Sequence, residues 1–303
     1  MRRVISLNFN QEFKERIKEA EEIIKKYLPK EEGLQKIICE AMNYSVLGGG
    51  KRLRPVMMKA TYELFGGKGE VIEPFMAAIE MIHTYSLVHD DLPAMDNDDL
   101  RRGRATTHVK YNEALAILAG DGLLNFAFET AVKAFEYDVD AKVVAKALKV
   151  LATKAGIYGM IGGQTVDIEA ESGNQILDED TLMFIHKNKT AALIECAMMI
   201  GAILAGASET EIDAVEKIAY SIGVAFQIQD DILDVIGNEE VLGKPIGSDA
   251  KNEKLTYVSL KGLEIAKEDV AKLSNEAILA IKTFEKSASF LSELAKYLID
   301  REK

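Results

Sequence analysis

Helical periodicity is the feature of this sequence that most restricts its fold. Apolar residues recur at spacings of three and four along almost the whole chain, and no run of alternating β-branched residues is long enough to predict a strand. All five prolines fall where a helix starts, breaks or turns. No internal repeat or low-complexity linker divides the chain. We therefore predict one all-α domain that spans residues 1–303 as a helical bundle.

The same periodicity predicts where the helices lie, with errors of a few residues at each end. Glycine runs at Gly48–Gly50 and Gly162–Gly163 indicate interruptions, and the polar segment 237–256 indicates a loop. The expected helices are 9–28, 33–47, 54–65, 71–91, 110–119, 121–136, 139–157, 179–188, 190–206, 209–236, 260–284 and 287–302.

Charge and cysteine content exclude several classes of protein. The chain has 37 basic and 49 acidic residues, a net charge of −12, which makes nucleic acid an improbable partner. Cys39 and Cys196 lie far apart in no metal or redox spacing, so we expect buried free thiols in a reducing cytoplasm.

Neither a signal peptide nor a membrane span is expected. Met1-Arg2-Arg3 is followed by no long apolar segment. The longest apolar run, Ala191 to Ala207, is broken by Glu195 and is shorter than the roughly 20 residues that cross a bilayer. We interpret this run as a buried core or subunit-interface helix.

An acidic segment ends one of the apolar helices. Five of the ten residues from Asp90 to Asp99 are aspartate, and such carboxylates repel one another unless cations lie between them. Pro93 disfavours continuation of the helix, so the chain can turn and bring Asp96 back beside Asp90 and Asp91. Hard oxygen ligands suit Mg²⁺. The alternative is a solvated acidic helix end, although the helix dipole disfavours acids there.

A second acidic stripe lies on a later helix. Gln227, Asp230, Asp231 and Asp234 follow the spacing i, i+3, i+4, i+7, and apolar residues surround them. A mostly buried helix points such a stripe at another element or a cavity. Two acidic clusters in one helical chain indicate carboxylates that hold a shared metal cluster from both sides.

Basic residues follow these motifs and suit a small polyanion. Lys51 and Arg54 lie in the first helical turn after a glycine run, where an anion site and a solvated helix start are both possible. His83 lies seven residues before Asp90, so both face the same side of the helix, as a core residue or a ligand. The other candidates for phosphate binding are Arg101, Arg102, Lys189, Thr190, Lys244 and Lys254.

Taken together, these motifs resemble the trans-prenyltransferases, specifically the short-chain isoprenyl diphosphate synthases. The resemblance runs from about residue 10 to Arg301, and no family motif is missing. Its motifs are Gly49-Gly50-Lys51-Arg52-Leu53-Arg54-Pro55, Asp90-Asp91-Leu92-Pro93-Ala94-Met95-Asp96 with Arg101-Arg102-Gly103, Gly162-Gly163-Gln164, Lys189-Thr190, and Gln229-Asp230-Asp231-Ile232-Leu233-Asp234.

The resemblance implies a helical bundle around a deep cavity, usually a homodimer, that joins an allylic diphosphate to isopentenyl diphosphate and releases diphosphate. It implies Mg²⁺ at Asp90, Asp96 and Asp230, with Asp91 and Asp234 in support. It places the allylic diphosphate on Arg101, Lys189, Thr190, Gln227, Lys244 and Lys254. It places isopentenyl diphosphate on Lys51, Arg54, His83 and Arg102.

Product length and rival activities complete the predictions. In the family, the residues four and five before the first aspartate line the floor of the chain pocket, here Ser86 and Tyr85. The aromatic ring resembles that of bacterial-type farnesyl diphosphate synthases, whose product is C15, although Tyr85 could instead simply pack in the core. Geranylgeranyl diphosphate synthase is the alternative. A class I terpene cyclase or a non-catalytic subunit fits less well, because both acidic motifs and a second basic site are present.

Overall fold

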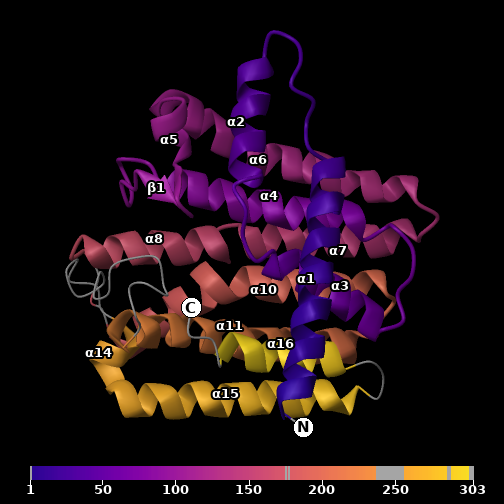
Figure 1. Ribbon diagram of the computed structural model, residues 1–303, viewed down its shortest axis with the longest axis vertical. Helices are drawn as coiled ribbons and strands as arrows, with labels where there is room; N and C mark the ends of the chain where they lie inside the picture. The colour runs from indigo at the N-terminus through magenta and orange to yellow at the C-terminus, as the bar shows by residue number, and fades with distance from the viewer. Residues whose placement is uncertain (1, 175, 177, 237–255, 285–287, 300–303) are drawn as a thin grey trace. The chain divides into compact units, whose positions relative to one another are not determined.

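The computed structural model of the chain describes residues 2–174, 176, 178–236, 256–284 and 288–299 (Figure 1). The chain divides into two compact units. Unit 1 comprises residues 1–59 and 68–148, and unit 2 comprises residues 60–67 and 149–303. The predicted all-α class is confirmed, since the described strands form only one hairpin with two residues in each strand. The single domain over residues 1–303 stays a prediction.

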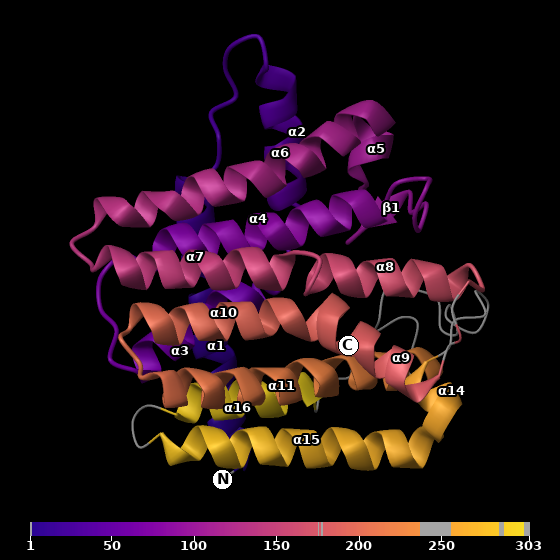
Figure 2. The same cartoon turned by 180° about the vertical axis from the view of Figure 1, so that it is seen from behind.

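Unit 1 is built on an apolar helix, α4. Nearly every residue of α4 from Pro74 to Tyr85 is buried, and α6 lies along it (Figures 1 and 2). A proline in the first turn of α4 and an asparagine cap on α6, Asn112, fix where these helices begin. The elements are α1 (Arg2–Lys26), α2 (Lys36–Val46), the start of α3 (Leu53–Leu64), α4 (Glu73–Asp90), β1 (Leu100–Arg101), β2 (Arg104–Ala105), α5 (Thr107–Lys110), α6 (Glu113–Ala131), the 3₁₀ helix η1 (Val132–Glu136) and the start of α7 (Ala141–Ala155).

Unit 2 is organised around the long helix α11. It packs against α10 and α15 (Figure 2), and a core that includes Val224, Ile228 and Ile232 lies on its buried side. All thirteen residues of α10 are buried, which confirms the predicted buried helix in the long apolar run. The elements are the end of α3, the end of α7, α8 (Met160–Glu171), α9 (Glu179–Ile185), the π-helix η2 (His186–Ala191), α10 (Ala192–Leu204), α11 (Glu209–Ile236), α14 (Tyr257–Lys261), α15 (Leu263–Thr283) and α16 (Ser289–Ile299).

Two predicted helix boundaries are wrong, and glycines explain both. The predicted break near residue 120 is absent, because α6 continues through Gly120, where a Cβ would lie 2.0 Å from Nε2 of His89. The predicted interruption at Gly162–Gly163 is the first turn of α8. A Cβ on Gly163 would lie 2.2 Å from the backbone nitrogen of Lys189. These glycines permit close packing and do not end helices.

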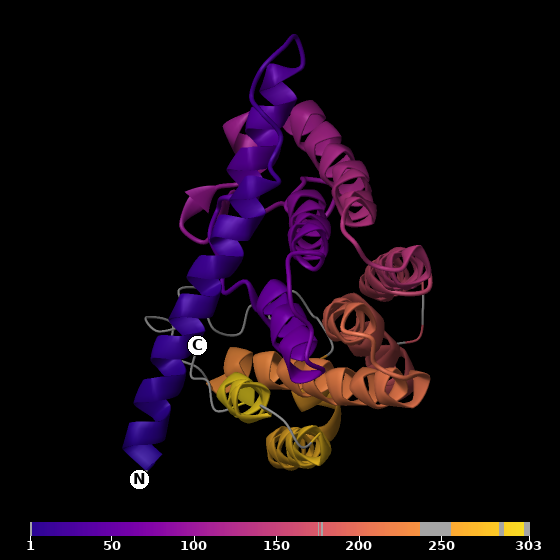
Figure 3. The ribbon, with the colours of Figure 1, turned by 90° about the vertical axis from the view of Figure 1, so that its right-hand side faces the viewer.

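Other differences are smaller. The predicted helix 260–284 is two helices, α14 and α15, separated at Gly262, whose φ of +83° suits glycine. A short hairpin after the acidic segment, seen as arrows in Figure 3, was not predicted. Cys39 and Cys196 are buried thiols that form no disulfide, as predicted. The predicted loop 237–256 lies almost entirely outside the described residues.

Among the residues that the structure describes, one helical stretch, Glu113–Glu136, has the length and apolar composition that could cross a membrane, and 39% of its most apolar window is buried. Buried helices of globular proteins share this composition. The absence of a membrane span stays a prediction.

Candidate active site

The acidic end of α4 turns sharply. Asp90 is the last residue of the helix and is half-buried, and the backbone N–H of Asp96 donates a hydrogen bond of 2.8 Å to the carbonyl oxygen of Asp90. The expected turn after Asp91 is therefore present in the backbone. Asn97 follows with φ of +54°, a conformation that asparagine tolerates better than most residues. The turn leaves the Asp96 side chain exposed.

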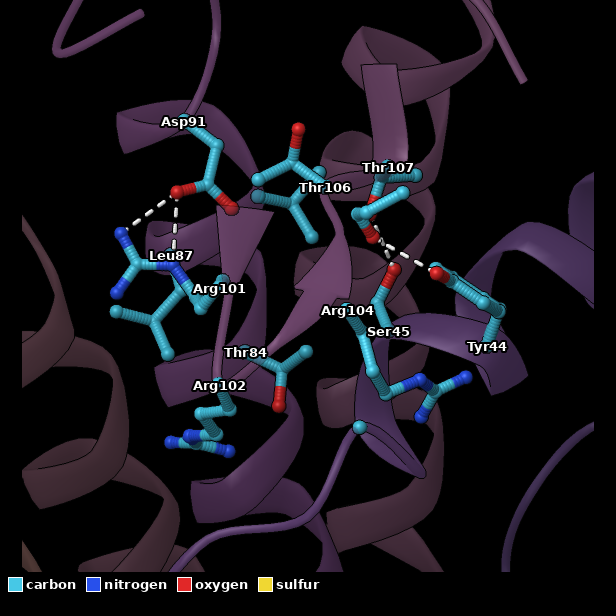
Figure 4. Close-up of a pocket in the computed structure, with 13 residues that line it drawn as sticks. Tyr44, Ser45, Thr84, Leu87, Asp91, Arg101, Arg102, Arg104, Thr106 and Thr107 are labelled. Carbon is cyan, nitrogen blue, oxygen red and sulfur yellow. Dashed lines mark hydrogen bonds and ion pairs between the residues drawn. The ribbon is translucent and has the colours of Figure 1, made fainter. Parts of the chain in front are cut away.

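Asp91 is bound to Arg101 rather than standing open to solvent. Its Oδ1 accepts a hydrogen bond of 2.7 Å from Nε of Arg101 and lies 2.6 Å from Nη2 (Figure 4). Burial raises the pKa of the Asp91 carboxyl, and the Arg101 guanidinium opposes this rise. Arg101 also lies 3.7 Å from Asp98. The guanidinium thus stands at the edge of the acidic turn.

Arg102 lies against the glycine run that precedes α3. Its guanidinium donates a hydrogen bond to the carbonyl of Gly49. A Cβ on Gly50 would lie 2.6 Å from Nη1 of Arg102, so a side chain at this position would displace the arginine. The φ angles of Gly49 and Gly50, +85° and +134°, also favour glycine. The absence of side chains at Gly49 and Gly50 therefore leaves room for the Arg102 guanidinium against the backbone.

His83 belongs to the same basic group. Its pKa lies well below the usual histidine value, first because of burial and then because of the charges of Arg54 and Arg102. The ring is therefore neutral at pH 7 and can donate one N–H to an anion. The structure brings His83, Arg54 and Arg102 close enough to interact electrostatically, and Lys51, half-buried, lies on the same segment as Arg54.

Two predicted phosphate ligands of unit 2, Lys189 and Thr190, lie on the π-helix η2. Nζ of Lys189 lies 2.5 Å from Oδ2 of Asp167 on α8. The Thr190 hydroxyl donates a hydrogen bond of 2.8 Å to Oε1 of Gln227 on α11. π-helical turns are rare and occur often at functional sites. Here the turn presents both predicted ligands, Lys189 and Thr190, toward polar partners.

The second acidic motif is not a uniform stripe. Asp231 is 5% exposed and accepts hydrogen bonds from Nε2 of Gln227 at 3.2 Å and from the backbone N–H of Tyr257 at 2.8 Å. Asp234 is buried as well, at 3%, whereas Asp230 is half-buried. Asp231 thus holds the start of α14 against α11, a role that helical spacing alone did not predict.

The metal roles of Asp90, Asp91, Asp96, Asp230 and Asp234 stay predictions. Within the described ranges, no group of three or more His, Cys, Asp or Glu side chains is close enough to hold a metal ion by itself. Mg²⁺ commonly binds through one or two carboxylates plus waters and substrate phosphates, so such a group is not required. Lys244 and Lys254 lie outside the described residues.

The two residues predicted to set product length lie one helical turn before Asp90. Tyr85 is 6% exposed, and its hydroxyl is buried without a hydrogen-bond partner in the described structure. Burial, with a contribution from Asp90, raises the pKa of Tyr85 to about 12. The Ser86 hydroxyl donates a hydrogen bond of 3.0 Å to the carbonyl of His83. A buried phenol without a hydrogen-bond partner lowers the stability of the fold.

Sequence reasoning missed three charged residues near these groups. Arg52 and Glu80 form a buried ion pair beside the glycine run, with 2.6 Å between Nη1 and Oε1. Asp167 pairs with Lys189. Signals were present. Glu80 is the one acid between Pro74 and His89 of an apolar helix, and Asp167 lies about one turn after the motif Gly162-Gly163-Gln164.

Comparisons with known proteins identify the family. The family model of polyprenyl synthetases matches residues 35–296. The chain is 44% identical to a geranylgeranyl diphosphate synthase from Cyanophora paradoxa over 95% of this chain and 94% of that one. It is 42% identical to farnesyl diphosphate synthase from Escherichia coli (strain K12), over 98% and 100% of the respective chains.

A solved structure is similar throughout its length. The geranyltransferase of Helicobacter pylori, solved in complex with magnesium and isoprenyl diphosphate, superposes with a TM-score of 0.81 at 31% identity, over 96% of both chains. The family match covers well over half of the chain, and the relatives exceed 40% identity over nearly all of it. The chain belongs to the polyprenyl synthetase family and is a short-chain prenyltransferase.

Proposed function

We propose that this prenyltransferase condenses isopentenyl diphosphate with dimethylallyl and then geranyl diphosphate to give farnesyl diphosphate, a C15 product, and diphosphate. The observation that carries the proposal is the basic group of Lys51, Arg54, His83 and Arg102. A transferase needs a site for a second diphosphate, whereas a class I terpene cyclase needs only one. A neutral His83 among arginines suits an N–H donor to a phosphate oxygen.

The proposed chemistry uses the two basic groups differently. The C–O bond of the allylic diphosphate breaks, and its electron pair leaves with the diphosphate. The allylic carbon forms a C–C bond with the terminal alkene carbon of isopentenyl diphosphate, and the new cation loses a proton, in this family to the released diphosphate. Arg101, Lys189, Thr190 and Gln227, with Lys244 and Lys254, would hold the leaving diphosphate and stabilise its growing charge.

The acidic residues fit Mg²⁺ by their chemistry. Asp90, Asp91, Asp96, Asp230 and Asp234 offer only hard oxygen donors, which Mg²⁺ prefers. Bound there with the allylic diphosphate, Mg²⁺ would offset negative charge on the leaving group. The magnesium in the Helicobacter pylori relative supports this cofactor.

The proposed C15 product length depends on Tyr85. The relatives include both farnesyl and geranylgeranyl diphosphate synthases, so similarity alone does not decide between C15 and C20. The observation that favours C15 is the buried ring of Tyr85, five residues before Asp90. Five residues of helix rise about 7.5 Å, which puts the ring deeper along α4 than the acidic turn.

We further propose that the enzyme is a cytoplasmic homodimer. Ile117, Leu118, Val132 and Phe135 lie along the helical stretch of α6 and η1, and each is between 46% and 55% exposed. An apolar stripe of this kind suits a partner surface. The buried thiols of Cys39 and Cys196, which form no disulfide, suit a reducing compartment. Light scattering of the purified chain tests the dimer, and Leu118→Glu should shift it toward monomer.

Product analysis tests the activity. The purified enzyme is incubated with isopentenyl diphosphate, dimethylallyl diphosphate and Mg²⁺, and the products are dephosphorylated and separated by chain length. We expect farnesol, with no product when isopentenyl diphosphate is omitted. A cyclic product from geranyl diphosphate alone would favour a terpene cyclase, and geranylgeraniol would favour the C20 alternative.

A further inference from the structure

We propose that the buried ion pair of Arg52 and Glu80 positions the residues that bind isopentenyl diphosphate. The inference rests on the proposed function and adds two residues to it. The side chains of Arg52 and Glu80 are 2% and 4% exposed, so neither can reach a bound diphosphate. Any effect on that site must therefore act through the residues that they hold in place.

Arg52 links three elements of unit 1. Its Nη1 donates a hydrogen bond of 2.6 Å to Oε1 of Glu80 on α4, and its Nη2 donates one of 2.8 Å to the carbonyl of Val46 at the end of α2. Its Nε lies 3.7 Å from Oε1 of Glu21 on α1. The planar guanidinium fork hydrogen-bonds Glu80 and Val46 at once, which a lysine ammonium cannot do with the same geometry.

The backbone of Arg52 is as constrained as its side chain. Its φ is +48°, in the left-handed region that non-glycine residues rarely adopt. Its carbonyl accepts a hydrogen bond of 3.1 Å from the N–H of Val56, so the residue also starts α3. Lys51 and Arg54 lie on either side of it in sequence. Holding Arg52 in this conformation therefore fixes the direction in which Lys51 leaves the glycine run and Arg54 enters the helix.

Glu80 connects this segment to the remaining members of the group. It lies three residues before His83 on α4, so both occupy the same face of the helix. Arg102 rests on the glycine run, where it contacts Gly49 and Gly50. The ion pair thus fixes the glycine run relative to α4. Lys51, Arg54 and Arg102 lie on or against the glycine run, and His83 lies on α4.

The pair contributes geometry and not charge. Arg52 and Glu80 carry opposite charges 2.6 Å apart, so the pair adds no net charge to the site. The net positive charge comes from Lys51, Arg54 and Arg102, and Arg101 also acts on His83. Removing one partner alone would leave a buried charge and risk unfolding. The informative variants are Arg52→Lys, which keeps the charge without the fork, and the double variant Arg52→Met with Glu80→Met, which keeps the volume without either charge.

Steady-state kinetics with each substrate varied in turn test the inference. In both variants we expect the KM for isopentenyl diphosphate to rise about tenfold, because small displacements of binding groups are costly, while the KM for geranyl diphosphate changes less than about twofold. Equilibrium dialysis with isopentenyl diphosphate should show the same loss of affinity. If the double variant does not fold, Arg52→Lys still gives the comparison.

A matched control comes from an ion pair in unit 2 between a half-buried lysine and a buried glutamate. Lys154 contacts Glu195 and Glu216 in unit 2, and the double variant Lys154→Met with Glu195→Met should leave the KM for isopentenyl diphosphate unchanged. Unchanged KM values in folded Arg52 variants, or equal increases for both substrates, would overturn the inference. A wild-type enzyme without turnover dependent on isopentenyl diphosphate would instead refute the proposed function.

Discussion

Replacing Tyr85 separates a chain-length role from a packing role. The ring lies in the wall of α4, 6% exposed, with an edge-to-face contact to His89 at 5.9 Å between ring centres. Tyr85→Ala removes the whole ring, and Tyr85→Phe removes only a hydroxyl that has no hydrogen-bond partner in the described structure. If the ring limits elongation, Tyr85→Ala should give products longer than C15, and Tyr85→Phe should not.

The expected stability changes follow from the same contacts. Removing a buried aromatic side chain costs about 3–5 kcal/mol of unfolding free energy. Removing a buried hydroxyl that has no hydrogen-bond partner raises the unfolding free energy by about 1–3 kcal/mol. Tyr85→Ala should therefore lower the unfolding free energy by about 2 kcal/mol, whereas Tyr85→Phe should leave it unchanged or raise it. Both variants should remain folded for product analysis.

The assay is chromatography of dephosphorylated products, with urea unfolding of each variant in parallel. The ratio of C20 to C15 product should rise in Tyr85→Ala and stay at the wild-type value in Tyr85→Phe. A Tyr85→Ala enzyme that is folded, active and still makes only the wild-type product would refute the reasoning. Longer products from Tyr85→Phe would show that the hydroxyl, and not the ring, limits product length.

Three further predictions concern unit 2. Lys154→Met leaves Glu195 buried without its cation and should lower the unfolding free energy by about 3–5 kcal/mol. Unfolding in urea measures this loss, and a change below about 1 kcal/mol would contradict it. Burial lowers the pKa of His186 to about 4, so the unfolded chain binds more protons between pH 6.5 and 4. Stability should fall by about 3 kcal/mol as the pH drops through this window, and His186→Gln should flatten the dependence. Asp167→Asn releases Lys189 and should raise the KM for the allylic diphosphate by up to about fivefold, with the KM for isopentenyl diphosphate unchanged.

The fold could be predicted from the sequence wherever apolar spacing decided the structure. The apolar run of α10 and the long periodic helix α11 appear where expected, because burial of one face dominates their energy. Some glycines were wrongly predicted to interrupt helices. A glycine that ends a helix and a glycine that lets another element pack closely cannot be distinguished by sequence. Gly120 and Gly163 are of the second kind, and only the positions of His89 and Lys189 reveal it.

The candidate site could be predicted only in part. The turn after Asp91 followed from Pro93, a local effect on the backbone. The pairing of Asp91 with Arg101 and the burial of Asp231 under α14 depend on contacts across 10 and 26 residues of chain. Helical spacing places residues on a face, but it does not identify what that face meets. The low pKa of His83 likewise depends first on its burial in the fold and then on arginines from other elements.

The most direct test of the account is a crystal structure with Mg²⁺ and an unreactive allylic diphosphate analogue. We predict that carboxylate oxygens of Asp90 and Asp230 bind metal ions that contact the same diphosphate. Metal ions bound by one of these motifs alone, with the other directed elsewhere, would contradict it.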